Sequence, residues 1–436
     1  MNTKLNFLKG ASLVGLMLLA NVVFAQYDPI QYFRYNDKRG VNVFETSKDD
    51  SVVFDGIKVR VGGDFAIQFQ GLSQSSGLAT ASGIDTLQRL VNNINLPTAN
   101  LNLDVQLADG VRLHMRTYLS SRHHSEAWVK GGYLQFDNLN FIKDGFLGGF
   151  MDVATIRFGY NDINYGDTHF RRSDNATVIY NPFVGNYIMD SFTTEPFGEL
   201  TIQKNGILGV IGLTNGRLNQ SAADPTASTP PNAPLDGDNG ASIYLKLGYD
   251  KQINEDFRFR LTGSYYSSSD KSTREYMYGG DRAGARYYEV YNRRTENNDF
   301  EPRLNPGWAY LSAYQFNPFI KYKGLEFFGV YENAGNGDSS VGGDYTQTGG
   351  ELLYRFGGQD QLYVGARFNG VKGNATDAAL DRNINRQNFA FGWFLTDNIV
   401  TKFEYVSEKR DGDGWIGTKY QDAKFDGIMI EAAISF

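Results

Sequence analysis

Basic side chains occupy alternate positions in several apolar segments of this chain. In residues 111–116, VRLHMR, the two arginines share one parity and the apolar side chains take the other. The same rule puts eight basic residues on the polar side of their segments: Arg112, Arg116, Arg157, Arg258, Arg260, Arg355, Arg367 and Lys402. A guanidinium group presents a planar fork of donors that suits phosphate or carboxylate. Gathered on one face, such residues would attract anions.

A period of two is the pattern of a β-strand, so strands must position these side chains. The last ten residues, GIMIEAAISF (427–436), show the period most clearly. Their isoleucines and the terminal Phe436 fall on one face, while Glu431 and Ser435 fall on the other. A final strand of this kind is typical of a barrel whose outer face meets lipid and whose inner face lines a water-filled lumen.

About sixteen such segments follow one another from residue 57 onward, an even number, as in single-chain bacterial barrels. Asp109-Gly110 and Asn205-Gly206 supply tight hairpin turns between them. Every second connection is short, and the intervening connections are long and polar. This sorting predicts an all-β fold, a transmembrane antiparallel β-barrel with short periplasmic turns and long extracellular loops.

The first 25 residues have the features of a cleaved export signal. Lys4 and Lys9 flank the start of an apolar run over 11–20, and Ala25 places a small residue at the predicted cleavage site. The run is shorter than the ~20 residues that a spanning helix needs, which argues against the alternative of an N-terminal membrane anchor. We therefore expect a signal peptide over 1–25, a periplasmic N-terminal arm over 26–50 and a barrel over 51–436.

The composition narrows the class of protein. Aromatic residues make up 14% of a chain that is polar on average, a combination that fits aromatic girdles around a polar lumen. The net charge of −7 argues against a nucleic-acid partner, which would require a basic patch. The absence of cysteine excludes thiolate metal sites and thiol catalysis.

Three C-terminal features carry a more specific resemblance. Residues 351–371 (ELLYRFGGQDQLYVGARFNGV), residues 393–406 (WFLTDNIVTKFEYV) and the terminal Phe436 resemble the C-terminal hairpins of the phosphate-selective porin O and P family of Gram-negative bacteria. The resemblance implies an outer-membrane porin that passes small hydrophilic solutes passively and uses luminal arginine and lysine to favour anions such as phosphate. Its other partners would be outer-membrane lipid and lipopolysaccharide. Because barrels of this size commonly form trimers, we also expect a homotrimer.

The connection over 161–199 is the third long one in the chain. In porins the third loop commonly folds inward, and a barrel this wide would otherwise leave an open channel. We expect this loop to form the constriction, with five residues near its narrowest point: Tyr165, Asp167, Arg171, Arg172 and Asp174. The alternative is a solvated loop that points outward.

Other functions require features that the sequence offers weakly or not at all. A general unselective porin or a structural outer-membrane protein would result if the luminal bases were neutralised by acids. A gated transporter would need a plug domain, for which the arm is too short. A barrel-embedded hydrolase would need a cluster of serine, histidine and aspartate, whereas His123 and His124 are adjacent and face apart on an extended chain. We predict no catalytic residue, no metal site and no cofactor.

Overall fold

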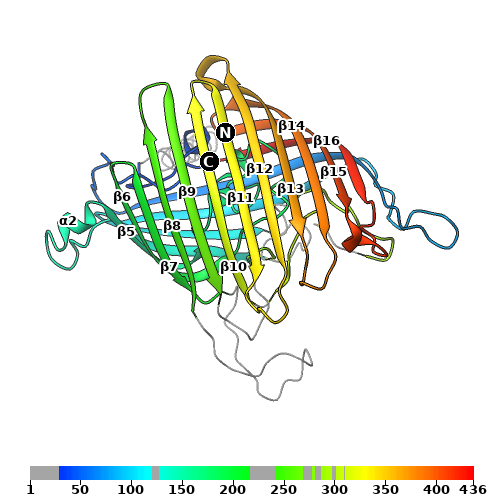
Figure 1. Ribbon diagram of the computed structural model, residues 1–436. Helices are drawn as coiled ribbons and strands as arrows, with labels where there is room; N and C mark the ends of the chain where they lie inside the picture. Colours follow the sequence, from blue (N-terminus) through cyan, green and yellow to red (C-terminus); the bar gives the residue numbers. More distant parts are fainter. Residues whose placement is uncertain are drawn as a thin grey trace, which may run out of the picture.

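The computed structural model describes residues 29–119, 127–216, 241–268, 277–279, 286–296, 301–308 and 310–436. Within these ranges the chain forms one closed barrel of sixteen antiparallel strands, in which each strand pairs with its sequence neighbours and the last strand pairs with the first (Figure 1). The predicted all-β fold, an antiparallel barrel of about sixteen strands, is confirmed. The predicted signal peptide, residues 1–25, lies outside the described residues.

The strands vary in length around the wall. They are β1 (Lys58–Ser75), β2 (Asn93–Ala108), β3 (Val111–Leu119), β4 (Ala127–Phe136), β5 (Ala154–Asp162), β6 (Thr194–Lys204), β7 (Ile207–Thr214), β8 (Ser242–Gln252), β9 (Phe257–Ser268), β10 (Leu311–Tyr322), β11 (Leu325–Asn336), β12 (Asp344–Phe356), β13 (Leu362–Gly373), β14 (Arg382–Thr396), β15 (Ile399–Asp411) and β16 (Lys424–Ser435). No helix in the described ranges is long and apolar enough to cross a membrane.

The alternation of side chains gives the wall two different faces. β16 runs antiparallel to β1, with Phe65 opposite Ile434. Along β16, Ile428 and Ile430 are exposed on the outside, whereas Met429 and Glu431 are fully buried on the inside. Similar alternation along the other strands makes the outer wall a belt of exposed apolar side chains around a polar interior.

Short and long connections separate to the two ends of the barrel. At one end the strands are joined by residues 109–110, 205–206, 253–256, 323–324, 357–361 and 397–398, with the 3-10 turn η5 (Gly358–Asp360) in the fifth of these. We call this the short-turn end. One longer connection, 137–153, also lies there and contains α2 (Gly148–Met151).

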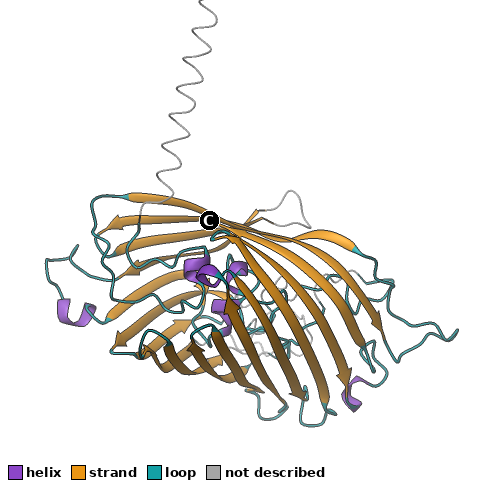
Figure 2. Cartoon of the chain, turned by 90° about the horizontal axis from the view of Figure 1, so that it is seen from above, coloured by secondary structure: helices purple, strands orange, loops and turns teal. Residues whose placement is uncertain are grey.

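The connection between β5 and β6 occupies the centre of the barrel. Residues 163–193 contain the 3-10 turns η2 (Thr168–Arg171) and η3 (Val178–Tyr180), and nearly all of their side chains are buried. The Ala176 N–H donates to Asn100 of β2, and the Ile188 N–H donates to Asn369 of β13. Figure 2 shows short helical turns inside the ring of strands. This segment, the luminal loop, therefore crosses the barrel from wall to wall.

The luminal loop ends earlier than its predicted boundary at residue 199. β6 already begins at Thr194, so Glu199 lies on a strand and faces inward. Pro196 and the inward-facing Phe197 interrupt the polar-in, apolar-out pattern at this point. For that reason the two-residue alternation did not show that β6 begins at Thr194.

The N-terminal arm also lies inside the barrel. Residues 29–50, with the 3-10 turn η1 (Lys38–Gly40), contact the wall at the short-turn end. The Gln31 N–H donates to Gln106, the Lys38 N–H donates to the Asp397 carbonyl, and the Asn42 amide donates to Glu326 at 2.7 Å. The sequence analysis predicted an arm over 26–50, and the described part of this segment lies across the lumen at the short-turn end. Its aperiodic sequence gives no sign of the luminal partners that hold it.

Candidate pore and its charged lining

The eight basic residues expected to line a pore all point into the barrel. Arg112 and Arg116 lie on β3, Arg157 on β5, Arg258 and Arg260 on β9, Arg355 on β12, Arg367 on β13 and Lys402 on β15. Alternation along each strand is the cause, because the neighbouring positions carry the apolar side chains of the outer face.

Seven of these eight form ion pairs in the described part of the chain. The pairs are Arg112–Asp104 (3.1 Å), Arg157–Glu199, Arg258–Asp250 (2.7 Å), Arg260–Asp167 (2.7 Å), Arg355–Glu326 (2.9 Å), Arg367–Glu351 (2.7 Å) and Lys402–Glu431 (3.0 Å). The expected excess of luminal positive charge is thus mostly compensated. Three of the compensating acids, Glu199, Asp250 and Glu326, were not identified as luminal from the sequence.

Asp167 of the luminal loop binds polar and basic side chains of β8 and β9. Its carboxylate accepts from Arg260 at 2.7 and 2.8 Å and from the Thr262 hydroxyl at 2.8 Å, and Lys246 of β8 donates to it at 3.0 Å. Burial alone would raise the pKa of Asp167, but Arg260 and Lys246 hold it below its usual value. The loop is therefore tied to this wall by a charged carboxylate.

Arg171 ties the same loop to the β12–β13 side. It donates to Glu351 at 2.9 Å, and Glu351 also receives Arg367 of β13 and the hydroxyl of Tyr187. One buried carboxylate thus serves two guanidinium groups and a phenol. Such a site is stable only with every partner present.

The remaining predicted loop residues stabilise the loop itself. Arg172 forms a two-nitrogen contact with Asp190 at 2.7–3.0 Å and lies over the ring of Phe192. Asp174 lies 3.6 Å from Lys130 of β4. Tyr165 is fully buried with its ring 6.1 Å from that of Tyr266, and burial raises its pKa well above the usual value. These three therefore help to hold the loop rather than project into free space.

The arm contributes charged residues that sequence reasoning did not assign to the lumen. Glu45 lies 3.1 Å from Lys246 and 2.8 Å from Arg260, and Phe44 packs against Phe170 and Phe319. Arg34 donates to the carbonyls of Gly40 and Phe170. No periodicity marks this segment, so only the fold could place it.

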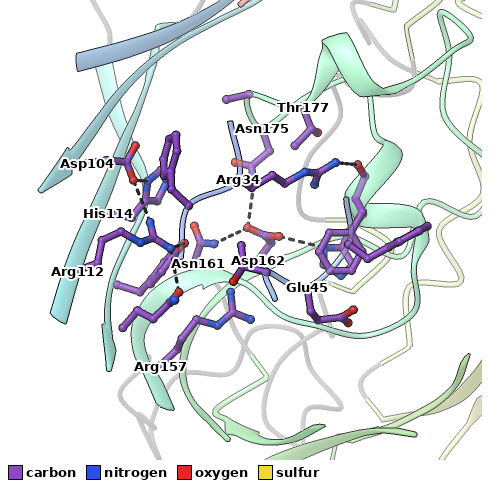
Figure 3. A pocket seen from close by; sticks show the side chains of 18 of the residues that line it. Arg34, Glu45, Asp104, Arg112, His114, Arg157, Asn161, Asp162, Asn175 and Thr177 are labelled. Carbon is purple, nitrogen blue, oxygen red and sulfur yellow. Dashed lines mark hydrogen bonds and ion pairs between the residues drawn. The ribbon is translucent and has the colours of Figure 1, made fainter. Parts of the chain in front are cut away.

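A cavity of about 130 Å³ remains between the β2–β6 wall, the arm and the luminal loop (Figure 3). Its charged lining comprises Arg34, Glu45, Asp104, Arg112, Arg116, Arg157 and Asp162, together with His114 and His169. Four guanidinium groups thus face three carboxylates. Burial lowers the pKa of His169, which favours its neutral form.

Several polar atoms of this lining have no hydrogen-bond partner among the described residues. They are Nε of Arg112, Nε2 of His114, and Oδ1 of Asn161 and of Asn175, all buried. Buried polar atoms are nearly always satisfied, by water where protein offers no partner. The cavity is therefore a place for water or for a polar solute.

Two of the cavity arginines lie apart from any carboxylate partner. Within the described ranges, Arg34 and Arg116 form no ion pair. Arg116 donates to the amide oxygen of Asn102 at 3.0 Å, and the Arg34 guanidinium stacks 3.9 Å from the ring of Tyr180. Burial lowers the pKa of Arg34 to about 10, which leaves it positive at neutral pH. These two residues supply the local excess of positive charge, which Asp162 of the same cavity offsets in part because its carboxylate acts on both groups.

Two larger cavities flank the arm at the short-turn end. One, of about 680 Å³, lies beside residues 43–49 of the arm and the ends of β6–β9, and the other, of about 390 Å³, lies beside Lys38 and Asn42. The first shares Phe44, Glu45 and Gln203 with the inner cavity. These three residues separate the inner cavity from the mouth of the barrel.

Further buried arginines, which the sequence analysis did not assign to the lumen, lie inside the barrel. Arg386 of β14 and Arg410 of β15 both pair with Glu408, and Arg286, from the connection between β9 and β10, pairs with Glu431 at 3.0 Å. The parity that identified Lys402 also places Glu408 and Arg410 inside, once β15 is extended to Asp411. Arg286 carries no such signal, since it lies in a loop.

The histidines of the described residues are paired with polar groups other than hydroxyls. His114 contacts Asp104 at 2.8 Å, and His169 contacts Asp162 and Asn164, each at 3.1 Å. His123 and His124 lie outside the described residues. Neither described histidine is bonded to the serine or threonine that a hydrolase would use as its nucleophile. In the same ranges, no group of three or more histidine, aspartate or glutamate residues could hold a metal ion.

Together the wall and its interior define a class of structure, the closed sixteen-stranded antiparallel barrel with an apolar outer face and a charged interior. No protein-family model matches the chain, and no curated protein matches it. The resemblance to the phosphate-selective porin O and P family therefore remains a proposal.

Solved structures of three outer-membrane proteins share this fold. The trimer form of OmpT of Vibrio cholerae matches with a TM-score of 0.52 over 88% of this chain and 100% of its own, at 12% identity. The outer-membrane channel DcaP of Acinetobacter baumannii matches with 0.51 over 88% and 99%, at 12% identity. An anion-selective porin from Comamonas acidovorans matches with 0.50 over 87% and 100%, at 10% identity. At these identities the likeness shows a common fold.

Proposed function

We propose that this protein is an outer-membrane porin through which small hydrophilic solutes diffuse passively, with a preference for anions such as phosphate. The observation that carries the proposal is the wall itself, a closed barrel with an apolar outer belt and a charged interior that encloses a polar cavity. Three outer-membrane barrels of the same fold support it, two of them described as a channel or a porin.

The route for solutes follows the β2–β6 side of the lumen. On this side the inner cavity lies next to the larger cavity at the short-turn mouth, with Phe44 and Glu45 between them. The luminal loop and the described parts of the connection between β9 and β10 fill the rest of the cross-section, and the loop forms the constriction. Its residues Arg171 and Asp167 narrow the pore by anchoring the loop to the opposite wall.

The preference for anions rests on Arg34 and Arg116. Most other luminal bases are balanced by a carboxylate, so their fields largely cancel at the distance of a passing ion. The two guanidinium groups without an acidic partner leave the inner cavity with net positive charge, and a narrow, low-dielectric site focuses that field. This selectivity would be modest compared with that of an uncompensated basic lumen.

The family resemblance and the fold support further parts of the proposal. The precursor would be exported by cleavage of the signal peptide over 1–25, and the mature barrel would span the outer membrane in contact with lipid and lipopolysaccharide. We propose a homotrimer, by analogy with the trimer form of OmpT. No cofactor is required for diffusion through a fixed pore.

The test is single-channel recording in planar bilayers under gradients of potassium chloride and potassium phosphate. The expected reversal potential favours the anion, and it should move towards the cation in the double variant Arg34→Gln/Arg116→Gln. Lys372→Gln is the matched control, because Lys372 is an exposed lysine on the outer side of β13, away from the three cavities. Absence of channels would contradict porin function, and equal reversal potentials in the double variant and the control would contradict the assignment of selectivity.

A further inference from the structure

The connection between β4 and β5 differs from the other connections at the short-turn end. Those connections are tight turns, whereas residues 137–153 form an extended excursion that contains α2. Figures 1 and 2 both show α2 projecting sideways beyond the barrel wall. A long connection at the end where turns are otherwise minimal indicates a role other than joining two strands.

Apolar side chains dominate the surface of this connection. Phe141, Ile142 and Leu147 are 58%, 57% and 53% exposed, and Phe146 and Phe150 are also exposed. Outside the lipid-facing belt of a barrel, an exposed apolar group of this size marks an interaction surface.

This surface is continuous with the outer face of the barrel. The ring of Phe141 lies 5.4 Å from that of Phe136 on β4, and Phe136 stacks at 5.5 Å on Phe158 of β5. Phe158 is exposed on the outer wall. The apolar belt of β4 and β5 therefore extends without a break onto the connection.

The backbone of the connection is largely satisfied by its own turns. The N–H groups of Ile142, Phe146 and Phe150 donate to the carbonyls of Leu139, Lys143 and Leu147. Internal bonding of this kind lowers the cost of leaving water. The charged residues Lys143 and Asp144 are adjacent and exposed, so the segment carries two charged side chains among its apolar ones.

We propose that residues 139–150 are an interfacial anchor, which inserts its aromatic and aliphatic side chains between the headgroups and acyl chains of the leaflet at the short-turn end. Lipid is the occupant because the surface continues the lipid-facing belt and projects from the wall, which suits insertion into a lipid interface. A contact between copies in a cyclic trimer would instead require a complementary surface elsewhere on the outer wall. The inference rests on the membrane location proposed above.

Because the chain contains no cysteine, single labels report the environment of each position cleanly. Phe146→Cys and Phe150→Cys would be labelled with an environment-sensitive nitrobenzoxadiazole dye in the full mature chain, folded into phosphatidylcholine vesicles that contain lipids spin-labelled near the top of the acyl chain. Asp256→Cys, at another turn of the same end, is the aqueous control. Leu247→Cys, 72% exposed on the outer wall, is the control for insertion. Heat-modifiable migration on gels verifies that each variant is folded.

The anchor predicts blue-shifted emission and strong quenching by the spin-labelled lipid at both loop positions but not at Asp256→Cys. Emission and quenching equal to those of Asp256→Cys would overturn it. Blue-shifted emission without lipid quenching would also overturn it and would indicate burial against a second copy. If Leu247→Cys is not quenched either, the proposed membrane location fails, which separates that failure from failure of the anchor.

Discussion

Two sides of the lumen use the same residue types in different ways. On β9–β15, here the paired wall, basic side chains meet carboxylates and the luminal loop covers them, as with Arg367, Glu351 and Arg171. On β2–β5, here the open wall, Arg116 forms no ion pair within the described residues, and Nε2 of His114 and Oδ1 of Asn161 have no hydrogen-bond partner there. The difference shows that a luminal charge stabilises the protein where the loop covers it and meets solutes where the inner cavity remains beside it.

Removing the loop would abolish the difference between the two walls, and this has the largest expected effect. Deletion of residues 175–191 exposes Lys402 and Glu404, which now contact the loop at the Val178 carbonyl and the Val184 N–H. Single-channel conductance is expected to rise several-fold because the cross-section opens. Deletion of residues 376–379, in the connection between β13 and β14, should leave the single-channel conductance unchanged. Unaltered conductance in the folded 175–191 deletion would place the constriction elsewhere.

The paired wall is expected to be fragile towards loss of a shared carboxylate. Glu351→Gln leaves Arg171 and Arg367 buried beside a neutral amide. The free energy of unfolding should fall by about 3 kcal/mol, since a buried charge loses its partner. Denaturant titration of the folded barrel measures this. Glu255→Gln, at an exposed turn, serves as the control, and equal midpoints for the two variants would refute the structural role of Glu351.

The open wall is expected to respond in selectivity rather than in stability. Arg112→Glu/Arg116→Glu reverses charge beside the inner cavity and should shift the reversal potential towards cations in potassium chloride gradients. The shift should shrink as salt is raised, because screening weakens the field. A reversal potential that stays at its original value would show that ions pass elsewhere.

The smallest expected effect concerns His169, at the boundary of loop and cavity. Its pKa is lowered by burial, so the unfolded chain binds the additional proton more readily than the folded one. Stability should therefore decline as pH falls below the unfolded pKa of about 6.5. His169→Asn should reduce the loss in denaturant midpoint between pH 7.5 and 5. An identical loss in both proteins would mean that His169 does not contribute.

The strands were predictable because a two-residue period is a local property of the sequence. It located β16 and the hairpin at Asn205-Gly206, and it placed Arg112 and Lys402 on one side of their strands. The period did not locate the start of β6 at Thr194, because Pro196 and Phe197 break the alternation there.

The interior of the barrel was harder to predict, because its partners are distant in sequence. Glu45 meets Lys246 and Arg260 only after the arm enters the lumen, and nothing in residues 29–50 shows which wall they face. The excess of luminal positive charge was overestimated for the same reason. Many of the acids that compensate it come from the arm, the luminal loop and the ends of strands.

The most direct test of the account is cysteine modification during current recording, since the chain has no cysteine of its own. Asn161→Cys lines the inner cavity of the open wall, whereas Asn369→Cys replaces a fully buried residue of the paired wall that contacts the loop at Ile188. A negatively charged methanethiosulfonate reagent should reduce current through Asn161→Cys and leave Asn369→Cys unaffected. Modification of Asn369→Cys with no effect on Asn161→Cys would contradict the proposed route.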